Sequence, residues 1–292
     1  MTIWAASALV TLGLLALCYW GAGIILYPPK MSRMEVFPEQ FGVRYEKVSF
    51  KTRDGLTLKG WFMAAPDGGG RTILMCHGWG DNKGDLLKIT YFLNHASGFN
   101  LFYFDNRSHG ESERDMTTMG YLELIDFEAA MNYLREHKPQ CLKKLGVFGL
   151  SMGAAVACMA MPDYPQIKAA VLESPFTDYT RVVRQWSWNH YHLPYFPFVM
   201  LTLFMLRLRV GQPKVDGYSP IAFVPRISPR PLLVIGGAKD RLMLEKDVTA
   251  LYAAAGDPKQ LWIIPGAEHA KCHEAAGLEY ETRVAGFFKK HL

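Results

Sequence analysis

The sequence predicts an α/β domain with a mainly parallel β-sheet, preceded by one apolar N-terminal helix. Short apolar runs typical of buried strands alternate with amphipathic segments over most of the chain. Strands that alternate with helices form parallel sheets covered by helices on both faces. The 292 residues are enough for one such domain, and half of them are hydrophobic, which excludes a disordered chain.

The chain opens with an uncharged apolar segment from Thr2 to Pro29. It is longer than the roughly 20 residues that cross the hydrocarbon core of a bilayer, and aromatic residues typical of the membrane interface lie near both ends. We therefore predict a transmembrane anchor over 1–29 and a linker over 30–42. A cleaved signal peptide is the alternative, but the segment lacks a basic start and a clean small-residue cleavage site.

The charges beside this segment predict its orientation. Lys30 and Arg33 follow it and no charged side chain precedes it, so the positive-inside rule places the main domain on the cytoplasmic side of a single-pass protein. An exported form with a signal peptide is the alternative. The net charge of +5 includes no long Lys/Arg run, which favours a solvated or membrane-facing surface over nucleic-acid binding.

The predicted domain spans 43–292 and begins with a β-hairpin. Residues 43–66 alternate apolar and polar side chains around Asp54-Gly55, a pair that favours a tight turn. Further elements follow from apolar runs and their stop signals. In order they are a strand within 71–80, a helix over 81–96, a strand over 99–105 and a helix over 121–137.

The second half continues this alternation with one interruption. A strand over 144–150 runs directly into a small-residue helix, and another strand lies around 168–176. The aromatic-rich stretch 177–229 then breaks the pattern and is predicted to be an insert. After it come a strand over 230–237, a helix over 245–255, a strand over 260–266 and a terminal helix with an apolar stripe.

Ser151 stands at a junction between a strand and a helix, within the sequence Gly149-Leu150-Ser151-Met152-Gly153. A serine in such a sharp turn presents its hydroxyl above the sheet, and flanking glycines remove the Cβ atoms that would crowd the turn. The start of the helix also points backbone N–H groups at the site, which suits a developing oxyanion. The same glycines also fit an ordinary tight turn, so the motif by itself is ambiguous.

A serine needs a base to accept its proton and a third group to orient that base. Asp240 and His269 each follow a later predicted strand, at the sheet edge where Ser151 lies. Their order along the chain is serine, aspartate, histidine. Glu173 is the alternative acid and His273 the alternative base.

Two backbone N–H groups are predicted to bind the oxyanion. One belongs to Met152, and the other to Trp79 in the Gly-rich turn "HGWG". The loop "DNRSHGES" supplies Asp105, Arg107 and His109, which we interpret as residues that brace the loop. The five cysteines show no CxxC spacing, and no metal- or phosphate-binding motif is present, so no metal site is predicted.

Together these motifs resemble the serine-hydrolase branch of the α/β-hydrolase superfamily. The matching pieces are "HGWG", "DNRSHGES", "GLSMG", "GAKDRLM" and "GAEH", spread over 43–292. The resemblance implies an α/β-hydrolase fold with a mostly parallel, eight-stranded sheet, a Ser151–His269–Asp240 triad and no cofactor. The apolar N-terminal helix makes the chain similar to membrane-anchored proteins with this domain.

In this family the insert between the sixth and seventh strands commonly forms a helical cap. Here the insert is 177–229, and the resemblance places Trp186, Trp188, His190 and Tyr191 as candidates to line the substrate pocket. Each of them could instead only pack the cap against the core. An apolar, aromatic cap beside a bilayer favours acyl-ester or lipid-like substrates.

The sequence thus predicts a membrane-anchored serine hydrolase that cleaves carboxylic esters through an acyl-enzyme. Its expected partners are a small ester or lipid-like substrate and the membrane. A peptidase similar to prolyl oligopeptidase is one alternative. A membrane-tethered binding module that keeps the fold without using the triad is another.

Overall fold

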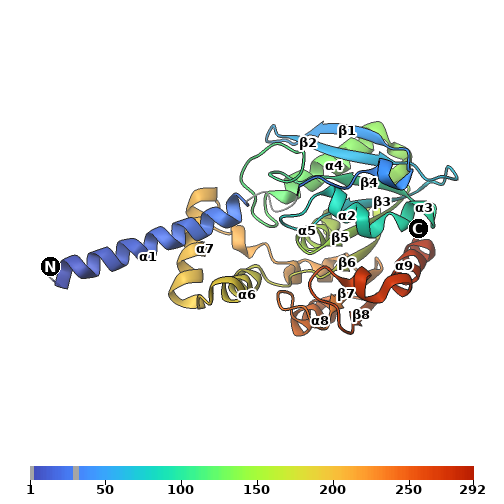
Figure 1. Ribbon diagram of the computed structural model, residues 1–292. Helices are drawn as coiled ribbons and strands as arrows, with labels where there is room; N and C mark the ends of the chain where they lie inside the picture. The colour runs from blue at the N-terminus through green and yellow to red at the C-terminus, as the bar shows by residue number, and fades with distance from the viewer. Residues whose placement is uncertain (1–2, 29–32) are drawn as a thin grey trace.

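The computed structural model describes residues 3–28 and 33–292. A layered α/β body carries one long helix, α1 (Ile3–Leu26), whose N-terminal part projects away from it (Figure 1). Within the described residues, α1 is the single helix long and apolar enough to cross a membrane, unless two bent helices of the insert count as one further span. Lys30, part of the orientation argument, lies outside the described residues, and the predicted domain limits remain a prediction.

An eight-stranded sheet forms the centre of the body, as predicted. The order across the sheet is β1-β2-β4-β3-β5-β6-β7-β8, and β2 alone runs antiparallel to its neighbours. The strands are β1 (Glu46–Lys51), β2 (Thr57–Met63), β3 (Arg71–Cys76), β4 (Asn100–Phe104), β5 (Lys144–Leu150), β6 (Ile167–Glu173), β7 (Leu232–Gly237) and β8 (Lys259–Ile264).

The sequence pattern of each strand follows from its place in the sheet. The central strands are buried on both faces and therefore read as continuous apolar runs, as in β3 and β7. The first two strands form the predicted hairpin, in which β1 alternates buried and exposed residues. Gly55 turns the chain between them with a φ of +95°, a conformation that glycine adopts without strain.

Helices cover both faces of this sheet. The apolar contacts of one face come from α4 (Glu123–His137), α5 (Met152–Ala160) and α8 (Glu245–Ala254). Those of the other come from α2 (Lys83–Thr90), α3 (Phe92–His95) and α9 (Cys272–His291). Short 3-10 turns lie at Pro38–Phe41, Pro139–Leu142 and Met161–Asp163.

Two predicted helices differ from the structure. The helix expected over 81–96 is two helices, α2 and α3, separated at Tyr91, whose ring stacks on Phe41 at 4.5 Å. The first of them, α2, begins two residues later than expected because the Asn82 side chain caps it, accepting the backbone N–H of Gly84 at 2.8 Å. The terminal helix α9 is kinked at Gly277, where φ is +50°.

The insert between β6 and β7 forms a helical cap. It contains α6 (Tyr179–Tyr191), a π-helical turn (Tyr195–Val199), α7 (Met200–Val210) and the 3-10 turns Val215–Gly217, Pro220–Ala222 and Val224–Ile227. The helices α6 and α7 lie beside the C-terminal end of α1 (Figure 1), and one apolar cluster joins α1, α5, α6 and α7. The last turns of α1 are thus part of the protein core.

Candidate active site

Ser151 sits in the sharp turn that joins β5 to α5. Its backbone has φ +51° and ψ −113°, a strained conformation for a residue with a Cβ. A Cβ at Gly153 would lie 2.1 Å from the Cys76 carbonyl oxygen, and one at Gly149 would lie 2.5 Å from Ala154 Cα. The two glycines therefore allow the strand and helix to approach closely enough to form this turn.

The structure brings Ser151, His269 and Asp240 together in one hydrogen-bonded chain. His269 Nε2 lies 3.1 Å from Ser151 Oγ, and His269 Nδ1 lies 2.8 Å from Asp240 Oδ2. The other oxygen of Asp240 accepts the backbone N–H groups of Leu242 and Met243, both at 2.8 Å. The Asp240 side chain is fully buried, whereas that of His269 is 27% exposed. The carboxylate is held rigidly, while the imidazole remains accessible to a ligand.

The alternative acid and base lie elsewhere. Glu173 is fully buried and accepts the hydroxyl of Tyr280, and burial raises the pKa of its carboxyl. His273 Nε2 lies 3.0 Å from a Glu281 oxygen, and its ring stacks on Phe92. Neither residue forms the contacts with Ser151 and His269 that the triad geometry requires.

The Gly-rich turn after β3 lies against the nucleophile. A Cβ at Gly78 would lie 3.6 Å from Ser151 Cβ, so this backbone passes directly beside the serine. In this turn Asp81 donates its N–H to the Gly78 carbonyl oxygen and Gly80 donates its N–H to His109 Nε2, and the Trp79 N–H takes part in neither bond. The Met152 N–H lies in the first turn of α5, where helix geometry offers no intrahelical acceptor. Both positions suit an oxyanion hole.

The loop after β4 braces this turn, as predicted for its polar residues. Gly80 donates its N–H to His109 Nε2 at 3.0 Å, and His109 Nδ1 lies 2.7 Å from the Arg107 carbonyl oxygen. Burial lowers the pKa of His109, so the ring stays neutral and can accept that bond. Arg107 in turn forms a buried ion pair with Asp126 at 2.8 Å. Asp105 pairs with the buried Lys83.

One acid beside the site was not recognised from the sequence. Asp81 follows the Gly-rich turn, and its Oδ2 would lie 2.6 Å from a Cβ at Gly78. Burial, reinforced by the negative charge of Asp85, raises the pKa of Asp81 to about 6. An acid at the start of a helix has no distinctive sequence signal, because the helix dipole favours acids there in any protein.

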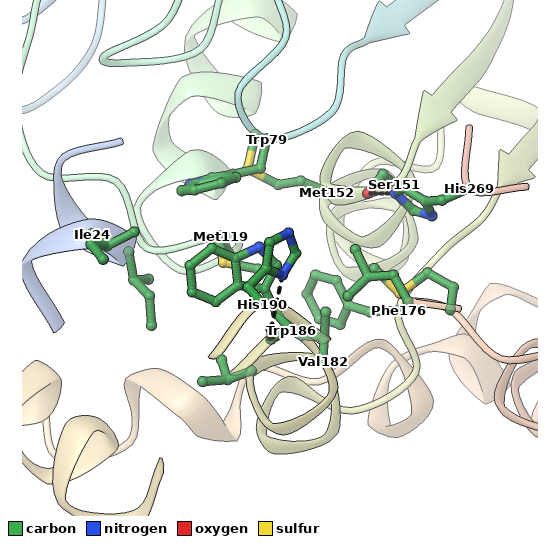
Figure 2. A pocket seen from close by; sticks show the side chains of 14 residues that line it. Ile24, Trp79, Met119, Ser151, Met152, Phe176, Val182, Trp186, His190 and His269 are labelled. Carbon is green, nitrogen blue, oxygen red and sulfur yellow. Dashed lines mark hydrogen bonds between the residues drawn. The ribbon is translucent and has the colours of Figure 1, made fainter. Parts of the chain in front are cut away.

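A cavity of about 240 Å³ opens above the nucleophile. Ser151 and His269 lie at one end of it, and Trp79 lies between that end and Ile24, as Figure 2 shows. Met152 also lines it. The remaining lining is almost wholly apolar and comes from the cap, from the loops and from α1: Ile24, Ile25, Met119, Phe176, Val182, Val183, Trp186, His190, Leu242 and Met243. Within the described residues, no group of three or more metal-binding side chains is found.

The predicted cap residues divide between two faces of α6. Trp186 and His190 point into the cavity and stack on each other at 4.7 Å (Figure 2). The structure does not bring Trp188 to this cavity: its side chain is 52% exposed, because residues two apart on a helix face different directions. Tyr191 lines a second, smaller cavity beside α1. The contribution of Ile24 and Ile25 from α1 was not predicted.

Comparisons with known proteins agree with this fold. A family model described as the alpha/beta hydrolase fold matches residues 71–196. The chain is 28% identical to the uncharacterized protein YfhR of Escherichia coli K12, over 77% of this chain and 73% of that one. It is also 28% identical to protein bem46 of Schizosaccharomyces pombe, over 87% and 82% of the two chains.

Among solved structures, the esterase Pf2001 of Pyrococcus furiosus matches with a TM-score of 0.75 and 26% identity, over 90% of this chain and 99% of that one. An acylaminoacyl peptidase of Pyrococcus horikoshii matches with a TM-score of 0.64 and 16% identity, over 86% of this chain and 42% of that one. The second likeness is one of fold alone.

Proposed function

Because the chain belongs to the α/β-hydrolase superfamily, we propose that it is a serine hydrolase that cleaves carboxylic esters, held at a membrane by α1. The observation that carries this proposal is the hydrogen-bonded chain from Ser151 through His269 to Asp240. It has the order and the atom contacts that activate a serine hydroxyl at neutral pH.

In the first half of the reaction, Ser151 Oγ attacks the ester carbonyl carbon and gives its proton to His269 Nε2. Asp240 holds the tautomer with hydrogen on Nδ1 and stabilises the imidazolium that forms. The N–H groups of Trp79 and Met152 bind the oxyanion. As the tetrahedral intermediate collapses, the leaving alkoxide takes the proton from His269, and the acyl group stays on Ser151.

In the second half, His269 takes a proton from water, whose oxygen attacks the acyl-enzyme carbonyl. Collapse of this intermediate releases the carboxylic acid and returns the proton to Ser151 Oγ. Every step uses side chains and backbone groups of the chain. The apolar lining of the cavity favours acyl groups over small polar ones, and the solved relative at 26% identity is named an esterase.

Ester hydrolysis and fluorophosphonate labelling test this proposal together. The full chain in detergent should hydrolyse p-nitrophenyl butyrate and react covalently with a fluorophosphonate probe. Ser151→Ala should abolish both, whereas Ser49→Ala, a matched change at an exposed serine of β1, should retain both. Fluorophosphonate labelling of the Ser151→Ala variant would contradict the proposal.

The membrane attachment requires a separate measurement. We propose that α1 remains uncleaved as a single-pass anchor, with the catalytic domain on the cytoplasmic side. An N-terminal epitope tag should then stay on the mature protein, and the protein should resist extraction by alkaline carbonate. Loss of the tag from the mature chain would instead support a cleaved signal peptide.

Two other functions make different predictions. A peptidase would cleave acylated peptides faster than acyl esters in a matched panel. A binding module would keep its cellular role in Ser151→Ala. The first alternative is motivated by the fold likeness to the acylaminoacyl peptidase.

A further inference from the structure

The projecting helix α1 forms part of the wall of the active-site cavity. Ile24 and Ile25 line the same cavity as Ser151, and Ile25 is buried. Figure 2 shows Ile24 at the end of the cavity opposite Ser151, with Trp186 and His190 between them. An extended substrate that begins at Ser151 and continues past Trp186 therefore meets α1.

A second cavity, of about 40 Å³, continues this path along α1. It shares four lining residues with the first: Ile24, Ile25, Val183 and Trp186. From there it follows α1 back to Leu17, between that helix and the π-helical turn. We call the two joined cavities the α1 groove.

Most side chains that line the α1 groove are apolar, and two of its hydroxyl groups already have partners. Ser187, in the smaller cavity, donates its hydroxyl to the Leu193 carbonyl at 3.3 Å. The other, Thr202, already interacts with the Cys18 thiol. An alkyl chain fits such a lining, whereas a peptide or a sugar would leave its own polar groups without partners.

With α1 as the proposed anchor, its length places this groove at the depth of the bilayer. Its 24 residues extend for about 36 Å, against a hydrocarbon core of about 30 Å. A span of about 20 residues that begins at Ile3 ends near Ala22. The part of α1 that precedes the buried Cys18 is therefore too short to cross the core alone.

The cap must consequently enter the membrane interface together with the last turns of α1. Its surface near α1 suits that position, because Tyr191, Phe204 and Leu208 are exposed there. Arg209 lies over the ring of Tyr19 at 4.5 Å and donates to its carbonyl at 3.3 Å, as expected at the level of the lipid headgroups.

We propose that the α1 groove binds the long acyl chain of a lipid ester that comes from the bilayer, so that α1 is a determinant of substrate specificity as well as an anchor. This proposal rests on the proposed esterase function and on α1 as a membrane anchor, and it names the class of substrate. The main cavity is smaller than the roughly 300–1,000 Å³ of typical ligand pockets, so a long chain must continue into the smaller cavity along α1.

Gly21 and Gly13 provide a matched test of the groove. Both are glycines of α1, but Gly21 lines the groove, with its Cβ position 3.3 Å from Thr202 Oγ1, whereas a Cβ at Gly13 has no neighbour within 4 Å. Gly21→Leu should fill the groove, and Gly13→Leu should make the same chemical change on the exposed part of the helix.

The measurement is kcat/KM of the full chain in detergent micelles, for p-nitrophenyl dodecanoate and p-nitrophenyl butyrate. Gly21→Leu should lower the dodecanoate value about tenfold or more and leave the butyrate value within about twofold. Gly13→Leu should change neither value. Equal losses on both esters, or an unchanged dodecanoate value in Gly21→Leu, would overturn the proposal.

A second pair of variants serves if Gly21→Leu fails to fold. Ile24→Ala should lower the ratio of dodecanoate to butyrate activity severalfold, and Ile3→Ala, at the exposed end of α1, should leave it unchanged. A ratio that Ile24→Ala does not move overturns the proposal. Loss of the esterase function itself is distinguishable, since wild type would then hydrolyse neither ester.

Discussion

Replacing Asp240 by asparagine separates the orienting role of this residue from its structural role. In the wild type, one oxygen accepts two backbone N–H groups and the other faces His269 Nδ1. The asparagine carbonyl oxygen can keep both backbone bonds only if its NH₂ group turns toward Nδ1. Nδ1 must then accept a hydrogen bond, which forces the imidazole proton onto Nε2.

That tautomer cannot act as the base. Its Nε2–H points at Ser151 Oγ, 3.1 Å away, where a lone pair is needed. Substitution of the triad aspartate by asparagine lowers kcat by a factor on the order of 10⁴ in such a triad, which corresponds to about 5 kcal/mol of transition-state stabilisation. We expect a loss of this order for Asp240→Asn in butyrate hydrolysis.

Thermal stability should distinguish Asp240→Asn from Asp240→Ala, although activity does not. Asp240→Asn keeps an acceptor for the N–H groups of Leu242 and Met243, so its Tm should stay close to that of the wild type. Asp240→Ala removes the acceptor from both, which costs roughly 1–3 kcal/mol for each N–H left buried. Thermal unfolding should therefore separate the two variants even though both are inactive.

The assay is kcat on p-nitrophenyl butyrate, with the rate of fluorophosphonate labelling as a second readout of serine reactivity. Both should fall together in Asp240→Asn. A variant with normal Tm that retains more than about a tenth of wild-type kcat would refute the reasoning, because the aspartate would then contribute too little to be the orienting group.

Three further predictions follow from contacts around the nucleophile. Gly153→Ala places a Cβ 2.1 Å from the Cys76 carbonyl oxygen and should destabilise the fold by roughly 1–3 kcal/mol, seen as a lower Tm; an unchanged Tm would contradict it. His109→Ala removes the acceptor that holds the oxyanion turn and should lower kcat about tenfold with little change in KM; a change in KM alone would contradict it. Burial raises the pKa of Asp81 from its ordinary value near 3.8 to about 6, so the free energy of unfolding of the wild type falls as the pH rises through that interval. Asp81→Asn should therefore be more stable than the wild type at pH 7 by up to about 3 kcal/mol and equally stable below pH 4. A difference in urea unfolding that does not depend on pH would contradict this prediction.

Much of the sheet and the triad contacts could be predicted from local sequence. Parallel strands buried on both faces leave continuous apolar runs, and the residues that follow them meet at one sheet edge. That reasoning places Ser151, Asp240 and His269 at one edge of the sheet, and the structure brings them within hydrogen-bonding distance. Glycine spacing predicted the tight approach at Gly149 and Gly153.

Contacts between segments far apart in the chain could not be predicted from local sequence patterns. Ile24 belongs to an apolar helix whose residues all look alike in sequence, so nothing marked it as a cavity residue. The orientation of Trp188 could have been predicted, since residues two positions apart on a helix do not share a face and Trp186 faces the cavity. The break at Tyr91 depends on tertiary packing against Phe41, which helix propensity does not contain.

The most direct test of the central claim is to map the fluorophosphonate adduct by peptide mass spectrometry on the full-length protein. The account predicts a single phosphonylated residue, Ser151, and a strongly reduced adduct in His269→Ala, because His269 Nε2 is the base that activates its hydroxyl. An adduct on another residue, or none on folded wild-type protein, would contradict it.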